Sequence, residues 1–238
     1  PARSVRAAAG RLASGVVQSA AALLRPAATP VAILYDRRAV ALPDGSRVHP
    51  HLGRFAAGRE PSRLHYLYSW GGHGAGLAAE RGTLRDHGIG AVTAALARVS
   101  RRSRSIAAVA ARLAPPVAAA CPELPPGLVH VLVADQLARF CWRHALFRRL
   151  FRRWRVRAVV VLDPDGKVPE VAAAKSLGLP VVEVQHGMFG PQEPDYSWTA
   201  AHRRAAAPMP VADRVVVFGP LWRSALVGAG YWDERSVR

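Results

Sequence analysis

The sequence predicts an α/β protein with a mainly parallel sheet and helices on both of its faces. The run 158–162 is continuously apolar, which is what a strand buried on both faces of a parallel sheet requires. A predicted helix at 167–177 separates it from a second apolar run at 181–185. This spacing is typical of a right-handed β-α-β crossover, and a third apolar run at 215–218 extends the same pattern.

The remaining elements follow from hydrophobic periodicity and from the residues that stop helices. Further helices are predicted at 1–25, 84–114, 128–154 and 221–228, and further strands at 31–35 and 64–70. Pro26, the pair Pro115-Pro116, and Gly178 with Pro180 are the expected helix stops. The chain therefore divides into an amino-terminal helix (1–30) and one larger domain (31–238).

Composition narrows the class of protein. The 33 basic residues against 16 acidic ones give a formal charge of +17, but the basic residues are nearly all arginines spread along the chain with alanine. Because a nucleic-acid binder concentrates its charge on one face, we expect no specific nucleic-acid partner. Cys121 and Cys141 form no disulfide framework, and no signal peptide or membrane span is visible, so we expect a cytoplasmic protein.

Candidate site residues follow the predicted strands. In open parallel sheets, ligands bind outside the carboxyl ends of the strands. Asp163 follows the first of the three runs, Gln185-His186-Gly187 follows the second, and Gly219 follows the third. If the first two strands are neighbours, Asp163 can orient His186 as a general base for a sugar hydroxyl. The alternative is structural: His186 holds its loop, and Asp163 caps the next helix.

Other residues allow two interpretations each. Glu183 lies inside a strand that otherwise reads as buried, so it either faces a pocket or pairs with an arginine. Tyr196 either lines a groove that binds a substrate or packs its own loop against the protein. For Trp198 we favour the packing role. The glycines at 71–76 are expected to form a turn, and His49 and His51 lack partners at metal-ligand spacing.

One predicted helical face raises the possibility of a membrane contact. Within 140–154, Phe140, Phe147, Phe151 and Trp154 fall on one narrow stripe, while Arg149, Arg152 and Arg153 face away. This face either packs on the core or lies on an anionic membrane surface, and the amphipathic pattern favours the core. A membrane contact would make the protein peripheral on the inner face of the cell membrane.

Three segments resemble a known family. The run 182–191 (VEVQHGMFGP), followed by Pro194-Asp195-Tyr196, resembles the strand, Gln-His-Gly, proline loop and tyrosine of GT-B glycosyltransferase-like proteins in bacterial capsule and surface-polysaccharide synthesis. The segment 212–232, from Ala-Asp through a strand and an aromatic helix to Gly-Tyr-Trp, is similar to the family's next segment, and 173–180 (AAKSLGLP) is similar to its helix-strand turn. The resemblance covers about 157–235, and the first 150 residues match only in layout.

The resemblance implies two Rossmann-like domains facing a cleft. This chain would be the amino-terminal one, which holds a carbohydrate or lipid-linked acceptor, and the nucleotide-sugar domain is expected beyond Arg238. His186 and Asp163 are the implied catalytic residues. The implied substrate-binding residues are Gln185, Gly187, Glu183, Tyr196 and Gly219. No metal or other cofactor is expected, since helix dipoles and basic side chains can stabilise the leaving diphosphate.

Two other classes stay open from the sequence. One is half of a nucleotide-sugar epimerase-like enzyme, which shares the two-domain layout but is expected to show more acidic catalytic residues than this chain does. The other is a non-catalytic basic module that binds anions or a membrane, which a salt-dependent affinity would support.

Overall fold

The computed structural model of the chain describes most of its carboxy-terminal two thirds and parts of the remainder. The described residues are 83–162, 165–185, 187–190, 193, 196–205 and 209–238, with 31–36, 40–41, 47–48, 64–68 and eight positions between 9 and 24. Those eight positions are all helical, as the sequence predicts for 1–25. The glycines at 71–76 and both His49 and His51 lie outside the described residues.

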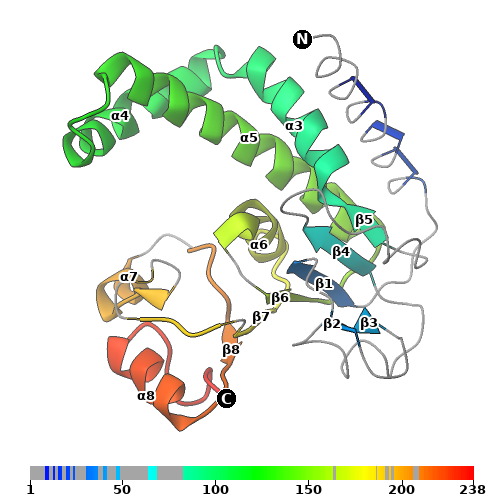
Figure 1. The fold of residues 1–238 in the computed structure, drawn as a ribbon, viewed down its shortest axis with the longest axis vertical. Coiled ribbons are helices and arrows are strands. Elements are labelled where there is room, and N and C mark those ends of the chain that lie inside the picture. Colours follow the sequence, from blue (N-terminus) through cyan, green and yellow to red (C-terminus); the bar gives the residue numbers. More distant parts are fainter. Residues whose placement is uncertain are drawn as a thin grey trace.

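Among the described residues, the main sheet has six parallel strands. They are β1 (Val31–Asp36), β4 (Leu64–Tyr68), β5 (Thr83–Arg85), β6 (Ala158–Leu162), β7 (Val181–Val184) and β8 (Arg214–Val216), in the spatial order β5-β4-β1-β6-β7-β8 (Figure 1). Every neighbouring pair is parallel, which confirms the predicted sheet. Residues 236–238 continue the sheet beside β8, where the Val215 amide donates to the Ser236 carbonyl at 2.8 Å.

A small antiparallel hairpin stands apart from the main sheet. It joins β2 (Val40–Ala41) and β3 (Arg47–Val48). The sequence predicts only a turn between these segments. Strands of two residues leave too short an alternating pattern for periodicity to detect.

The helices follow the predicted order, with corrections at 84–120 and with α7 as a helix that was not predicted. They are α3 (Asp86–Ser100), α4 (Arg104–Ala120), α5 (Pro126–Arg153), α6 (Val168–Lys175), α7 (Ala200–Arg204) and α8 (Pro220–Ala229), and the 3-10 turn η1 (Asp165–Lys167) precedes α6. The single helix predicted at 84–114 was wrong: β5 takes its first residues, and the helix is interrupted at 101–103. It resumes after Ser103, whose extended backbone (φ −63°, ψ 145°) fits the position before a helix.

The predicted stop at Pro115-Pro116 was also wrong, because both prolines lie inside α4. A proline removes one backbone donor, but the neighbouring amides can continue the ladder. Here the last turn closes when the Cys121 amide donates to the Val117 carbonyl at 3.1 Å. By contrast, the predicted stop at Gly178 is confirmed, since this glycine has a φ of 68° directly after α6.

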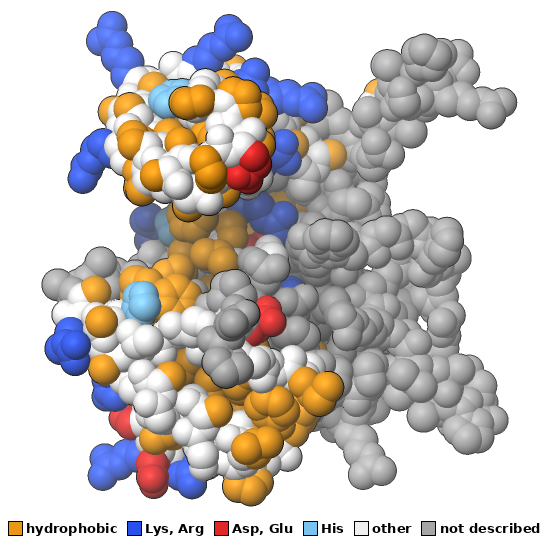
Figure 2. Space-filling model, turned by 60° about the vertical axis from the view of Figure 1, so that its left-hand side comes forward, with side chains coloured by type: hydrophobic (Ala, Val, Ile, Leu, Met, Phe, Trp, Pro, Cys, Tyr) orange, Lys and Arg blue, Asp and Glu red, His pale blue; other side chains and the backbone are white. Residues whose placement is uncertain are grey.

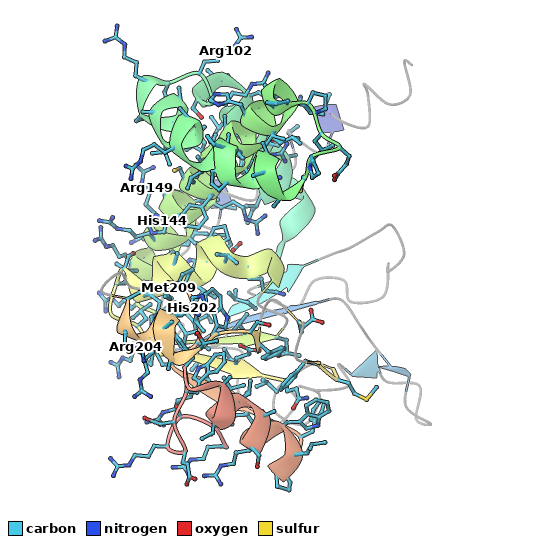
Figure 3. The ribbon with its side chains drawn as sticks, turned by 90° about the vertical axis from the view of Figure 1, so that its left-hand side faces the viewer. Arg102, His144, Arg149, His202, Arg204 and Met209 are labelled. Atoms are coloured by element: carbon cyan, nitrogen blue, oxygen red, sulfur yellow. The ribbon has the colours of Figure 1, made fainter. Side chains whose placement is uncertain are left out.

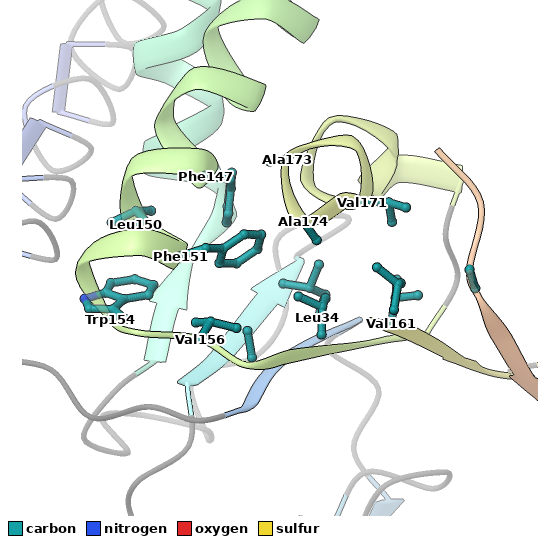
Figure 4. Packing of buried hydrophobic residues seen from close by; sticks show 14 of the residues in the cluster. Leu34, Phe147, Leu150, Phe151, Trp154, Val156, Val161, Val171, Ala173 and Ala174 are labelled. Atoms are coloured by element: carbon teal, nitrogen blue, oxygen red, sulfur yellow. The ribbon is translucent and has the colours of Figure 1, made fainter. Parts of the chain in front are cut away.

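The main core lies between the sheet and the helices α3, α5 and α6. Figure 4 shows Phe147 and Phe151 of α5 on the side of the helix that faces Leu34 of the sheet, with Trp154, directly after α5, near Val156. The side chains of Phe147, Phe151 and Trp154 are 0, 1 and 3% exposed. The core-facing interpretation of 140–154 therefore holds for these three aromatic residues, which are not available to a membrane.

The two faces of the sheet are covered unequally by described elements. Val159 and Val161 of β6 face the helical core, and the alternate residues Val160 and Leu162 form a separate cluster on the opposite face. The described helices α3, α5 and α6 pack on the first face. The cluster on the second face contains only strand residues among those described, so the helices expected there stay a prediction.

Candidate functional site

The strand order defines where a ligand would bind. From β1 the chain continues outward through β4 and β5, whereas β6, β7 and β8 continue outward on the other side. The order therefore reverses between β1 and β6, and such a switch point is the usual ligand-binding crevice of an open parallel sheet. The loops that follow β6, β7 and β8 all lie at this carboxyl edge.

The two predicted catalytic residues, Asp163 and His186, follow β6 and β7 in the sequence, and both are outside the described residues. β6 and β7 are direct neighbours, and Leu162 pairs with Val184 at their ends. This register confirms the premise that Asp163 and His186 follow adjacent parallel strands. Their approach to each other stays a prediction.

Gln185 connects the loops after β7 and β8. Its side chain is completely buried. The Nε2 atom donates to the Gly187 carbonyl at 2.7 Å, and the Oε1 atom accepts from the Phe218 amide at 2.8 Å. The backbone amide of Gln185 also donates to the Val216 carbonyl at 2.9 Å. These bonds hold the chain on both sides of His186, so Gln185 positions the loop, and its role in binding substrate stays a prediction.

The two predicted glycines contribute open backbone. A Cβ atom on either Gly187 or Gly219 would meet no other heavy atom within 4 Å. Gly219 has an extended backbone (φ 164°) and directly precedes Pro220, the first residue of α8. The amino-terminus of α8 therefore begins at the carboxyl edge of the sheet, where its free amides favour negative charge.

Glu183 lies on the helix-covered face of the sheet. It pairs in register with Val161 and Val215, which belong to the two large core clusters, and its side chain is 1% exposed. This burial places its carboxyl group within the fold, two residues before the carboxyl edge that Gln185 begins. The choice between a pocket and an arginine partner stays open.

Tyr196 packs in a second core cluster near α8. Its ring, 6% exposed, stacks on Phe189 with centroids 4.0 Å apart, and Phe189 in turn contacts Trp222 at 4.6 Å. Tyr196 and Phe189 also line a cavity of about 470 Å³ beside Leu226. Trp198 packs edge-on against His202 at 5.3 Å, which agrees with the packing role expected for it.

Several charged residues near the site were not singled out from the sequence. Glu170 in the first turn of α6 is completely buried, and it accepts from Arg143 of α5, whose Nε atom lies 3.0 Å from Oε1. Lys167, at the end of η1, is also fully buried. The sequence signal for Glu170 was an acidic residue among the apolar residues of its helix. Its partner could not be identified from the sequence, because Arg143 lies 27 positions away.

One acidic triplet after β6 bears on whether the candidate site could hold a metal ion. Asp163-Pro164-Asp165 directly follows β6, and two carboxylates at this spacing suit a hard divalent cation. The expectation of a metal-free site took the chain to lack any Asp-x-Asp triplet, and this one was overlooked. Within the described part of the chain, no group of three or more metal-ligating side chains comes together.

A groove separates the helical hairpin α4–α5 from α6. Its volume is about 860 Å³. Its walls include Leu113 and Val117 of α4, Leu132 of α5, Gly166 of η1 and Pro169 of α6. Figure 2 shows the hollow between the upper and lower lobes, with hydrophobic side chains inside it. The groove therefore ends close to the loop that follows β6. Among the described helices, none combines the length and apolarity needed to cross a membrane.

The three segments that carry the family resemblance contact one another. Lys175 forms an ion pair with Asp213, and Asp213 also accepts from the Val181 amide at 2.9 Å. The indole of Trp232 donates to the Ala212 carbonyl at 3.0 Å. These residues tie α6, β7 and β8 together at the end of the sheet opposite the candidate site, so their role is structural.

Comparison of the chain with protein-family models, with curated proteins and with solved structures finds no match.

Proposed function

We propose that this chain is the acceptor-side, Rossmann-like domain of a GT-B type glycosyltransferase. The enzyme would move a sugar from a nucleotide-sugar donor, held by a second domain, to a surface-polysaccharide or lipid-linked acceptor. The main support is the Gln185 cross-link, which fixes the Gln-His-Gly loop at the carboxyl edge of a parallel sheet. If β2 and β3 are left out and the six strands of the main sheet are numbered along the chain, their spatial order is 3-2-1-4-5-6. Dinucleotide-binding folds have the same order.

The proposed reaction assigns the proton transfer to His186. The acceptor hydroxyl oxygen bonds to the anomeric carbon of the sugar, and the bond from that carbon to the diphosphate oxygen breaks. The electron pair leaves with the diphosphate, and the imidazole of His186 takes the hydroxyl proton. Asp163 orients the imidazole and stabilises its protonated form. The arginine-rich helices and the amino-terminus of α8 would favour binding of negatively charged groups nearby.

The test measures sugar transfer by the protein that carries the nucleotide-sugar domain. A general base contributes about 10² to 10⁴ in rate, so His186→Ala should lower turnover by that factor while the thermal midpoint changes little. Asp163→Asn should act on the same step, and the double variant should be little worse than the single one. His130→Ala, on α5 far from the sheet edge, is the matched control.

Two results would count against this proposal. Near-normal turnover in His186→Ala would return this residue to a structural role. Turnover that falls only in proportion to the folded fraction would do the same. The 238-residue chain by itself should show no transfer from any nucleotide sugar, because the proposed donor site lies in another domain.

A further inference from the structure

The groove between the helical hairpin and α6 exists because two helices share one neighbour. α4 and α6 each pack along α5, but they do not pack extensively against each other. The space between them is the groove of about 860 Å³, with α5 as its floor and with α4 and α6 as its walls. Figure 2 shows it as a hollow between the two lobes. This volume lies within the range of about 300 to 1,000 Å³ that is usual for small-molecule sites.

The walls of the groove are apolar. The residues that α4 and α6 supply to the lining are Leu113, Pro116, Val117, Val168 and Pro169. Leu113 and Val117 are 44 and 42% exposed, and Leu132 on the floor is 47% exposed. Large apolar side chains that gather on one concave surface and stay open to water are typical of a ligand-binding groove. The part of a ligand that lies between the walls should therefore be hydrocarbon.

The polar side chains of the described lining all belong to α5. They are Gln136, Arg139 and Arg143. Arg143 is already engaged in the fold, because it pairs with the buried carboxylate of Glu170. Gln136 and Arg139 lie three positions apart on one helix, so their side chains are neighbours on the same face. The lining thus offers a ligand polar side chains at one place on the floor.

Arg139 keeps most of its hydrogen-bonding capacity. Its Nε atom donates to Oδ2 of Asp135 at 2.6 Å, and this is its only hydrogen bond or ion pair to a described residue. The two terminal amino groups of the guanidinium therefore retain their N–H donors. The side chain is 39% exposed, so these donors are accessible from solvent. The side chain of Gln136 likewise makes no hydrogen bond to a described residue.

These donors select the polar part of a ligand. A guanidinium presents paired N–H groups that match two oxygens of a carboxylate or a phosphate, and it contains no acceptor. The carboxylate of Asp135 offsets part of the charge of Arg139 but accepts only from its Nε atom. A head with several acceptor oxygens, which is an oxyanion, is therefore the complementary group. An ammonium head has only donors and finds no acceptor on Arg139.

The apolar walls distinguish a hydrocarbon chain from a peptide. An extended peptide carries an N–H and a C=O group on nearly every residue, and each of these groups needs a partner when it is buried. The described wall residues of α4 and α6 supply no polar side chain for them. A hydrocarbon chain needs no such partners, and its burial against apolar side chains is favourable.

We propose that the groove binds a small anionic amphiphile, which is a hydrocarbon chain with one carboxylate or phosphate head. The chain lies between α4 and α6, and the head accepts hydrogen bonds from Arg139 and Gln136. Two sources share this chemistry, a free fatty acid and a lipid phosphate. The inference does not rest on the proposed glycosyltransferase function, because it uses no residue of the sheet edge. Its failure would leave the role of His186 untouched.

The first test measures binding of dodecanoate and of dodecyl phosphate to the 238-residue chain by calorimetry, below the concentrations at which they form micelles. We expect saturable binding of one molecule per chain for at least one of them. Dodecylamine, which has the same chain length and the opposite charge, should not bind. Tighter binding of dodecyl phosphate would identify a lipid phosphate as the source, and tighter binding of dodecanoate would identify a fatty acid.

Matched variants separate the groove from general attraction of anions to a chain with a formal charge of +17. Arg139→Gln should weaken binding about tenfold, because it removes charge-assisted hydrogen bonds to the head. Glutamine can still bond to Asp135 four positions earlier, so the helix should stay intact. Arg149→Gln removes the same charge from α5 outside the lining and should bind normally. Arg149 projects from the margin of the molecule (Figure 3).

A second pair of variants tests the apolar contact. Leu132→Gln should weaken binding about fivefold, because the half-exposed Leu132 side chain loses its contact with the hydrocarbon chain. Leu128→Gln is the control, since Leu128 is 45% exposed on the same helix but does not line the groove. Both side chains are open to solvent, so neither substitution should unfold the chain.

Nuclear Overhauser effects locate the bound chain. The methylene protons of the ligand should show them to the methyl groups of Val117 and Val168, which lie on opposite walls. They should show none to Val109 of α4 or Val131 of α5, which are exposed outside the lining. Contacts to the second pair without contacts to the first would contradict the assigned site.

Several other outcomes would overturn the proposal. Absence of binding by both anionic amphiphiles would refute it. Equal binding of dodecylamine would refute the oxyanion head. Equal weakening in Arg139→Gln and Arg149→Gln would mean that net charge alone attracts the ligand. A dimer that Leu132→Gln dissociates, without any binding of amphiphile, would identify the groove as a contact between copies of the chain.

Discussion

Gln185→Ala should loosen the candidate site measurably. The substitution leaves the Phe218 amide and the Gly187 carbonyl without their partners, which lie 2.8 and 2.7 Å from the present side-chain atoms. Each unsatisfied polar group costs about 1 to 3 kcal/mol when it is buried, and both are only partly shielded here. We therefore expect a loss of about 2 to 4 kcal/mol in the free energy of unfolding.

Two measurements check this expectation. Urea unfolding gives the loss in stability, and hydrogen exchange of the Phe218 amide reports the bond itself, because this amide should exchange faster in the variant. Gln136→Ala is the matched control: Gln136 lines the groove on α5 without a side-chain hydrogen bond to a described residue, so its change should stay within about 0.5 kcal/mol. Unchanged exchange at Phe218, together with an unfolding midpoint equal to that of the control, would refute the cross-link.

Two further predictions concern charged side chains. Arg143→Met should destabilise the fold by about 3 to 5 kcal/mol in urea unfolding, because it leaves the buried Glu170 carboxylate without this partner. Adding Glu170→Leu should recover most of that loss, and a double variant worse than Arg143→Met would contradict the argument. Hydrogen bonds from Ser236 lower the pKa of Asp233 below its ordinary value of 3.8. Its stabilising effect is therefore complete above that pH and is lost as the pH falls toward the lowered pKa, so Asp233→Asn should flatten the acid dependence of the thermal midpoint below about pH 4.

The sheet could be predicted because its signals are local. A continuous apolar run marks β6, and β7 is apolar except for Glu183. The turn after the helix between them contains Gly178, whose positive φ is typical of that residue type. The interruption before Ser103 and the continuation through Pro115 were missed because both depend on how α4 packs along α5. Local propensity does not contain that information.

The candidate site was harder to predict for the same reason. The family resemblance implied a substrate-binding role for Gln185, but its hydrogen-bond partners could not be predicted from the sequence. Its actual partners depend on the register of β7 against β8, which brings Phe218 within reach although it lies 33 positions away. The pairing of Arg143 with Glu170 likewise joins two helices across the core. Such contacts follow from the assembled sheet and not from a motif.

Among the described elements α4 packs extensively only along α5, which has a consequence for cooperativity. A helix with one neighbour can separate from it without disturbing the sheet, so the outer part of the hairpin is a candidate for an independent unit of local unfolding. Its amides should then exchange with solvent at a lower free-energy cost than those of β6. Substitutions that weaken the hairpin would change how often it opens while leaving the global stability of the sheet domain almost the same.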